Sequence, residues 1–219
     1  MSVITIERKV LERNDSVAAQ NRRRFAAHKI CVFNVVSSPG AGKTTLLERT
    51  IERLSGSIRL AVVEGDVQTD VDARRVARYG VPVVQIVTNG GCHLEARLVQ
   101  EALDALDLPS TELLVIENVG NLVCPANYDL GEALKVVVLS TTEGDDKPLK
   151  YPAMFRNAGV LVINKIDLLP YVNCDMAAMR RHALQINPDL RVFEVSCTSG
   201  AGLTEWCDWV AGEVARARA

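Results

Sequence analysis

Residues 31–50 read CVFNVVSSPGAGKTTLLERT, in which an apolar β-branched run, a glycine-containing loop and a helical pattern follow one another. Cys31–Val36 is typical of a buried strand, and Thr45–Leu54 has the apolar spacing of an amphipathic helix. Between them, Gly42-Lys43-Thr44 stands in the strand–loop–helix context that a phosphate-binding loop requires. Glycines let the backbone turn its N–H groups toward phosphates, and the helix N-terminus adds partial positive charge. The segment therefore predicts a nucleotide-binding protein.

Individual residues of this loop have separate expected tasks. Lys43 is expected to reach the β- and γ-phosphates, and the Thr44 hydroxyl to ligate a nucleotide-bound Mg²⁺. Ser37 occupies the place where the usual pattern has its first glycine, and Gly40 supplies flexibility inside the loop instead. The residues predicted to bind nucleotide here are Pro39, Gly40, Ala41, Gly42, Lys43, Thr44 and Thr45.

Short β-branched runs alternate with helical patterns along the rest of the chain. Near-continuous apolar strands separated by helices predict an α/β fold of the P-loop NTPase type, with a mostly parallel sheet covered on both faces. Ligands of such sheets bind beyond the carboxyl ends of the strands. Further strands are expected at Leu60–Val63, Val83–Val87, Leu113–Ile116, Val136–Leu139, Val160–Ile163 and Val192–Val195, and helices near Val71–Tyr79, Leu94–Leu106, Asp175–Ile186 and Leu203–Arg218.

A second motif selects the base of the nucleotide. Asn164-Lys165-Ile166-Asp167 directly follows an apolar run. The Asp167 carboxylate can accept hydrogen bonds from guanine N1–H and the 2-amino group, a donor pair that adenine lacks, and such a site rejects bases that leave it unpaired. Asn164 is expected to tie the base to the phosphate loop, and the stem of Lys165 to pack along the ring. Ser196-Cys197, after the last strand, is the expected backbone contact to guanine O6.

Acidic residues at the ends of two other strands predict the Mg²⁺ and hydrolysis chemistry. Glu117 is placed to hold the Mg²⁺ shell or the attacking water, and Gly120 to respond to the γ-phosphate. In Glu64-Gly65-Asp66, Asp66 is expected to bind Mg²⁺ through water, with Asp70 in the same segment. Helix capping ahead of Val71 is an equally good interpretation of Asp66 and Asp70. Catalytic roles are assigned to Lys43, Thr44, Glu117 and Asp66.

Bulk properties favour a cytosolic globular protein. The chain has 219 residues, a net charge of −2 and 48% hydrophobic residues, so nothing in its charge predicts a nucleic-acid or membrane partner. The start of the chain, Met1–Glu7, lacks the pattern of a secretory signal, and we expect a cytoplasmic protein.

Residues 1–29, including Arg22–Arg24, are predicted to be a helical extension that is solvated or docked, or else a partner-binding arm. Residues 30–219 are predicted to form a single P-loop GTPase domain.

Two of the six cysteines lie in loops flanked by glycine or proline. Cys92-His93 precedes a predicted helix, and Cys124-Pro125 follows Glu117 by seven residues. Thiolate and imidazole suit Ni²⁺ or Zn²⁺, and three ligands would leave a coordination position open. On the residues alone, two loop thiols and a helix N-terminal histidine are the better interpretation, because ligands 31 residues apart are a weak signal. The other cysteines are predicted to be small buried hydrophobes: Cys31, Cys174, Cys197 and Cys207.

The chain also resembles the HypB GTPases of hydrogenase maturation, in the metallochaperone branch of P-loop GTPases. The resemblance runs from about Asn34 to the end and is carried by SSPGAGKTTLL, VVEGDVQTDVDARR, GGCHLEA, IENVGNLVCPANYDLGE, TEGDDKPLKYP and NKIDLLPY. It implies hydrolysis of GTP to GDP, a GTP-favoured homodimer, and nickel or zinc at Cys92, His93 and Cys124 near the dimer interface. It further implies a nickel chaperone similar to HypA as partner, and delivery of nickel to the [NiFe]-hydrogenase large subunit. The lack of an obvious catalytic glutamine or arginine finger predicts that hydrolysis is slow.

One departure and three alternatives accompany this resemblance. Many HypB proteins carry a Cys-rich N-terminal nickel site, whereas no Cys or His precedes His28 here, so we expect nickel to come from a partner. A urease-type nickel GTPase similar to UreG is expected to have Cys-Pro-His at its metal loop, unlike Cys92-His93. A small-metabolite kinase conflicts with Asn164–Asp167, and a non-enzymatic regulator conflicts with the full set of Lys43, Thr44 and Glu117.

Overall fold

A seven-stranded sheet organises the chain, and the computed structural model describes it over residues 6–219. All pairs of neighbouring strands are parallel, as in a P-loop NTPase, and the order is β3-β2-β4-β1-β5-β6-β7. The prediction for the secretory signal falls mainly on residues 1–5, which lie outside the described part. The strands are β1 Cys31–Ser37, β2 Leu60–Asp66, β3 Val83–Val87, β4 Leu113–Glu117, β5 Leu134–Ser140, β6 Val160–Asn164 and β7 Arg191–Glu194.

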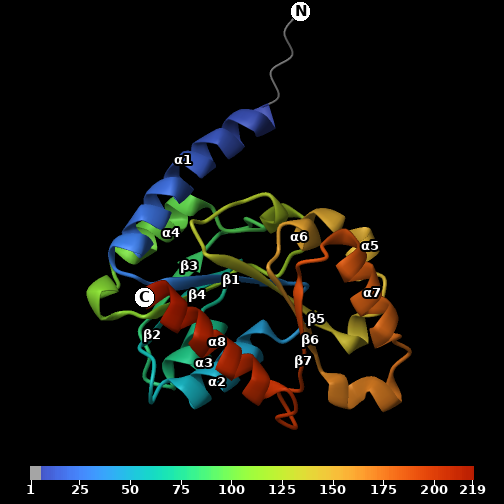
Figure 1. Ribbon diagram of the computed structural model, residues 1–219. Coiled ribbons are helices and arrows are strands. Elements are labelled where there is room, and N and C mark those ends of the chain that lie inside the picture. The colour runs from blue at the N-terminus through green and yellow to red at the C-terminus, as the bar shows by residue number, and fades with distance from the viewer. Residues whose placement is uncertain (1–5) are drawn as a thin grey trace, which may run out of the picture.

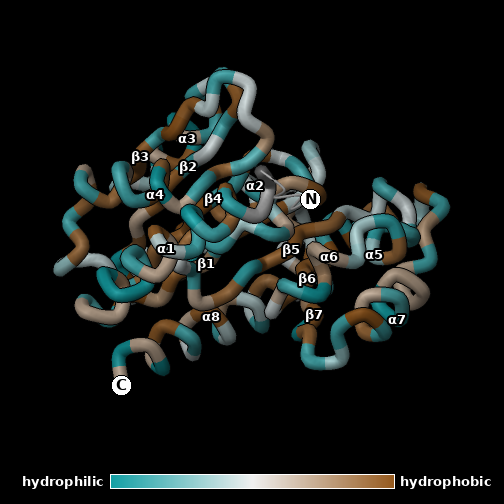
Figure 2. Tube along the Cα trace, turned by 90° about the horizontal axis from the view of Figure 1, so that it is seen from above, coloured by the Kyte–Doolittle hydropathy of each residue, from teal (hydrophilic) through white to brown (hydrophobic). Residues whose placement is uncertain are grey.

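Helices cover both faces of this sheet (Figure 1). Alternate side chains of a strand point to opposite faces. On β1, Phe33 and Val35 pack with α2 (Lys43–Leu54), α3 (Val71–Ala77) and α8 (Leu203–Arg218). Val32 and Val36 face the other side, which holds two separate apolar clusters. Figure 2 shows the largely hydrophobic strands between these layers. The helices of that second side are α1 Ile6–Ala27, α4 Ala96–Leu103, α5 Lys147–Lys150, α6 Pro152–Arg156 and α7 Met176–Ile186.

Helix α1 docks from Asn14 toward its C-terminal end, while its N-terminal end extends past the rest of the molecule (Figure 1). Asn21 Nδ2 donates to the carbonyls of Ala96 and Leu130 at 2.8 and 3.1 Å. Asn14 accepts from Ala96 N and donates to Asp129 O. The docked interpretation therefore holds for the C-terminal part of α1, and a partner-binding role of the extended part stays a prediction.

Gly131 permits this close docking. It adopts φ +94°, and a Cβ there would lie 2.8 Å from the carbonyl oxygen of Ala18 in α1. A side chain would therefore be strained in its backbone and would also collide with the helix.

Helix α4 begins at Ala96, two residues later than predicted, and ends at Leu103. Leu94 N donates to the side chain of Asn118 at 3.0 Å, and its buried side chain lies against Gly65. These tertiary contacts hold Leu94 outside the helix.

Several short elements were not predicted, because they are too brief to show an apolar period. They are α5, α6 and the 3₁₀ turns η1 Leu108–Ser110, η2 Cys124–Ala126, η3 Thr141–Glu143 and η4 Ile166–Tyr171. Within residues 6–219, no helix has both the length and the apolar character that crossing a bilayer demands.

Candidate nucleotide and metal sites

The phosphate loop joins the end of β1 to the start of α2. Gly40 and Gly42 adopt φ +79° and +97°, which a larger residue would adopt only with strain. The loop opens onto a cavity of about 500 Å³ that is also lined by Asp66, Arg75 and Gly120. Lys43 Nζ lies 3.2 Å from Ser37 Oγ. Ser37, which replaces the usual glycine, therefore supports Lys43 directly.

An acidic group lies beside this loop. Thr44 Oγ1 donates to Glu117 Oε1 at 2.7 Å, and Lys43 Nζ is 3.9 Å from the same oxygen. Oxygens of Glu64, Asp72 and Glu117 all lie within 4.8 Å of one another. Sequence reasoning chose Glu117 and placed the Glu64–Asp66 segment near the phosphates, but it assigned the ligand role there to Asp66. It missed Asp72. Glu64 and Glu117 are register partners on adjacent parallel strands, a relationship that needs the strand order.

Asp66 belongs to the cavity wall but not to this acidic group. Its Oδ1 accepts from Gln68 N at 2.9 Å, Thr69 N at 2.6 Å and Thr69 Oγ1 at 3.1 Å. Asp66 therefore fixes the turn ahead of α3. Asp70 occupies the N-cap of α3 without a side-chain cap bond and instead pairs with Arg74 at 2.8 Å.

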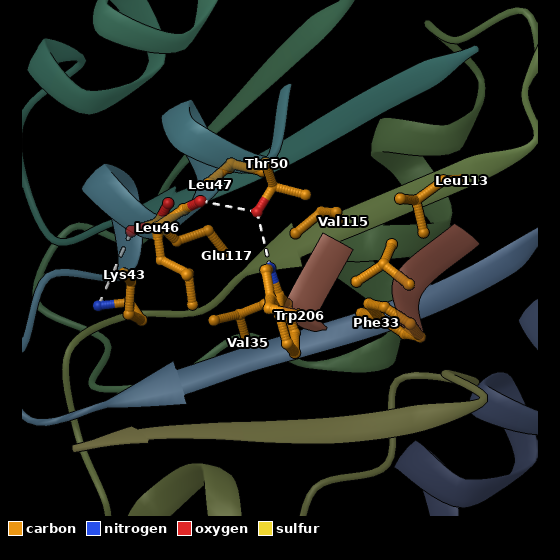
Figure 3. A pocket seen from close by; sticks show the side chains of 11 residues that line it. Phe33, Val35, Lys43, Leu46, Leu47, Thr50, Leu113, Val115, Glu117 and Trp206 are labelled. Carbon is orange, nitrogen blue, oxygen red and sulfur yellow. Dashed lines mark hydrogen bonds and ion pairs between the residues drawn. The ribbon is translucent and has the colours of Figure 1, made fainter. Parts of the chain in front are cut away.

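Burial governs the ionisation of the two glutamates. Burial, reinforced by the charge of Glu117, raises the pKa of Glu64 to about 11. Burial also raises the pKa of Glu117, against the opposing influence of Lys43. Figure 3 shows Lys43 and Glu117 together with apolar side chains around a cavity of about 20 Å³. Oε2 of each glutamate is buried and has no hydrogen-bond partner in residues 6–219.

The base-recognition motif lies against the phosphate loop. Asn164 Nδ2 donates to Ala41 O at 3.0 Å, and Lys165 Nζ donates to Gly40 O at 2.7 Å. Asn164 therefore contacts the phosphate loop, and its contact to the base stays a prediction. Asp167 Oδ1 is buried without a hydrogen-bond partner in the described part of the chain. A buried acceptor left unpaired is costly, so this oxygen suits a ligand that supplies donors.

The backbone after β7 makes contacts within the protein. Cys197 N donates to Asn164 Oδ1 at 3.4 Å, and Ser196 N donates to Ala201 O at 2.9 Å. The bond of Cys197 N is the longer of the two, and the contact of Ser196-Cys197 to guanine O6 stays a prediction. Cys31, Cys197 and Cys207 are buried as predicted, whereas Cys174 is only half-buried.

The structure brings the predicted soft-metal ligands together. One ligand atom each of Cys92, His93 and Cys124 lies within 4.8 Å of the others. Cys92 Sγ is 3.5 Å from His93 Nδ1, and His93 Nε2 is buried without a partner among the described residues. Burial lowers the pKa of His93 and so favours the neutral imidazole that binds metals. A hydrogen bond with Cys124, together with burial, raises the pKa of Cys92.

Gly120 lies between the two sites. A Cβ on Gly120 would lie 3.2 Å from both Cα and Cγ of Pro39. The segment that joins Glu117 to Cys124 therefore packs on the phosphate loop itself.

Comparison with known proteins identifies the family. Residues 31–194 match the family model described as CobW/HypB/UreG, nucleotide-binding domain. The chain is 55% identical to the "Hydrogenase maturation factor HypB" of Azotobacter vinelandii over 95% of its own length and 69% of that protein. The chain belongs to the HypB family. This is a P-loop NTPase family, in agreement with the parallel sheet and the phosphate loop.

Two solved HypB structures have the same fold. HypB from Archaeoglobus fulgidus superposes with a TM-score of 0.87 at 38% identity, covering 93% of this chain and 99% of the other. HypB from Helicobacter pylori, crystallised "in complex with nickel", gives a TM-score of 0.89 at 38% identity, covering 93% and 96%. The match to HypB thus extends over nearly the whole chain, including both candidate sites.

Proposed function

We propose that this HypB-family chain is a GTP-hydrolysing metallochaperone that binds nickel and assists its insertion into the [NiFe]-hydrogenase large subunit. The observation that carries the proposal is the convergence of Cys92, His93 and Cys124. Cys124 follows Glu117 by seven residues, and Glu117 contacts the first turn of the phosphate-loop helix. Loss of the γ-phosphate can thereby change the position of a metal ligand.

Guanine recognition rests on Asp167 and Asn164. The unpaired Asp167 oxygen matches the N1–H and 2-amino donors of guanine, and Asn164 joins this site to the phosphate loop. Hydrolysis of GTP to GDP and phosphate is assigned to Lys43, Thr44 and Glu117, and we expect it to be slow. Recognition of guanine by Asp167 argues against a metabolite kinase that uses ATP.

The donor set beside Thr44 fits Mg²⁺. A hydroxyl and the carboxylates of Glu64 and Glu117 offer only oxygen ligands, which Mg²⁺ prefers. Two of the carboxylate oxygens lack hydrogen-bond partners among residues 6–219. Mg²⁺ would neutralise developing charge on the phosphates. Thr44 and Glu117 would hold it, and Glu64 extends the originally predicted set. Asp66 stays a candidate for contact through water.

The cargo site suits Ni²⁺ or Zn²⁺. Two thiols and one imidazole leave a coordination position open, which a second copy of the chain or a recipient protein can fill. We therefore propose a homodimer favoured by GTP with the metal near its interface. A HypA-like chaperone is proposed as the nickel source. The separation of Cys92-His93 from Cys124 disfavours the urease-type arrangement expected for UreG.

Titration of the purified chain with Ni²⁺ and with Zn²⁺ tests the proposal. It is performed with GDP and with a non-hydrolysable GTP analogue, while mass is monitored. We expect one metal per chain or per dimer, a larger mass with the analogue, and metal affinities that differ between nucleotide states by about 5–150-fold. Equal affinities in both states would exclude coupling, and absent metal binding would exclude the chaperone function.

A further inference from the structure

A chain of buried polar side chains crosses the sheet face opposite helix α2. Asn34, fully buried in the middle of β1, is the register partner of Lys135 on β5. Both side chains lie on the face that also carries Val32 and Val36, between the two apolar clusters of that side. Buried polar groups in such surroundings need partners.

At one end of this chain, Asn118 contacts the segment that carries His93. Asn118 Oδ1 accepts from Leu94 N at 3.0 Å and from Val119 N at 2.9 Å. Its Nδ2 donates to Asn34 Oδ1 at 3.2 Å. The residue after His93 is thus held by the residue after Glu117.

At the other end, Lys135 holds the turn that carries Cys124. Asn34 Nδ2 donates to Glu132 Oε1 at 3.0 Å, and Lys135 Nζ lies 3.9 Å from that oxygen. Lys135 Nζ also donates to three backbone carbonyls, at 2.9, 3.1 and 3.2 Å, which belong to Pro125, Ala126 and Tyr128. The ring centroids of Tyr128 and His93 are 3.9 Å apart. Both metal-binding segments are therefore attached to one continuous network.

Glu117 and Asn118 connect this network to the α2 side of the sheet and so to the phosphate loop. Glu117 contacts Thr44 on the α2 side of the sheet, whereas Asn118 contacts Asn34 on the opposite side. Consecutive residues of extended chain point to opposite faces. A shift of the backbone at the end of β4 therefore moves both contacts at once.

We propose that one positioning network is formed by Asn34, Asn118, Glu132 and Lys135. It fixes the Cys92-His93 and Cys124 segments relative to each other and connects them to Glu117. The inference rests on the proposed metal-binding function. None of the four residues need touch the metal. They act through the segments that do, as outer-shell groups do in other metal sites.

The test compares nickel binding by the double variant Glu132→Gln/Lys135→Met with that of the wild type. The variant removes both buried charges together and keeps similar volumes, so neither charge is left unpaired. We expect nickel affinity to fall about 10–100-fold, and the thiolate-to-nickel absorption bands to change. GDP affinity should stay within about twofold of wild type.

A matched control separates positioning from general stability. Thr50, also buried, accepts a hydrogen bond from Trp206 Nε1 at 2.9 Å on the α2 side of the sheet. Thr50→Val should lower the melting temperature but leave nickel affinity and the absorption bands unchanged.

A second variant addresses the other end of the network and retains every buried charge. In Asn118→Leu, we expect weaker nickel binding and loss of the difference in nickel affinity between GDP and GTP-analogue states. It provides the decisive measurement if the double variant does not fold.

Two kinds of result would overturn the proposed positioning network. Folded network variants with wild-type nickel affinity and absorption bands would overturn it while leaving the metal site intact. A wild-type protein without nickel binding, or Cys124→Ala binding nickel as tightly as wild type, would overturn the proposed metal site and the network with it.

Discussion

Thr44 Oγ1 donates a 2.7 Å hydrogen bond to Glu117 Oε1, joining the first turn of α2 to the end of β4 across 73 residues of sequence. Lys43 lies 3.9 Å from the same oxygen. The residues expected to hold Mg²⁺ therefore already contact each other. Both residues would hold the ion, so Mg²⁺ would act directly at the strand end that precedes Asn118.

Glu117→Gln tests this arrangement. The amide keeps the size of the side chain but binds Mg²⁺ more weakly, so we expect GTP hydrolysis to fall about 100-fold. Affinity for GDP without Mg²⁺ should change little. Single-turnover hydrolysis and fluorescent GDP titration measure the two quantities. Hydrolysis at the wild-type rate would remove Glu117 from the catalytic assignment.

Asp167→Asn tests base recognition. The amide replaces one acceptor oxygen by a donor group, so the guanine N1–H and 2-amino donors lose partners and we expect GTP affinity to fall about 100-fold or more. XTP, whose O2 accepts a hydrogen bond, should bind the variant better than GTP does. Competition binding with GTP, ITP and XTP gives the order. An unchanged preference for GTP would place base recognition elsewhere.

Cys124→Ala tests the cargo site against a matched thiol. Removal of one of three ligands should abolish tight nickel binding and leave basal GTP hydrolysis within about twofold, since Cys124 lies outside the phosphate cavity. Cys174→Ala serves as the control, because Cys174 is a half-buried thiol outside the cluster. Equilibrium dialysis with Ni²⁺ measures both variants, and equal losses would contradict the assignment.

Gly131→Ala tests the docking of α1. The new Cβ would lie 2.8 Å from Ala18 O at φ +94°, so we expect a loss of about 1–3 kcal/mol in the free energy of unfolding. Gly212→Ala in α8 is the control, because its Cβ would meet nothing within 4 Å. That helix-interior change should stabilise the fold by about 0.5–1 kcal/mol. Urea denaturation measures both, and a neutral Gly131→Ala would mean that α1 is not held at this contact.

The ion pair of Arg22 with Asp129, at 2.8 Å, predicts a pH effect. Burial raises the pKa of Asp129, but the Arg22 hydrogen bond and the Gly131 N–H together lower it below the ordinary 3.8. The folded chain therefore binds this proton less readily than the unfolded chain. The stabilisation is present above about pH 4 and is lost as pH falls through the folded-state pKa.

Arg22→Gln should weaken this acid dependence. Its stability should decline less than that of the wild type between about pH 5 and pH 3, by a small amount because the pair is exposed. Arg23→Gln changes an exposed neighbouring residue and serves as control. Chemical denaturation at a series of pH values gives the curves, and parallel curves for wild type and Arg22→Gln would refute the assignment.

Local patterns predicted the phosphate loop, the base motif and the alternation of strands and helices, because each depends on residues close in sequence. Glu64 and Asp72 join Glu117 only through the strand order and the docking of α3, which no local pattern encodes. Asn34 was included in an apolar strand because its neighbours are apolar. Its partners Asn118 and Glu132 lie 84 and 98 residues later in sequence, so their pairing becomes visible only in the folded chain.

The docking of α1 also determines when this helix can reach its native contacts during synthesis of the chain. Its contacts reach Ala96, Leu130 and Asp129 across separations of 75, 109 and 115 residues. Chains are made from the N-terminus, and contacts of large sequence separation form late. The docking contacts of α1 can therefore be completed only after residue 130 has been synthesised.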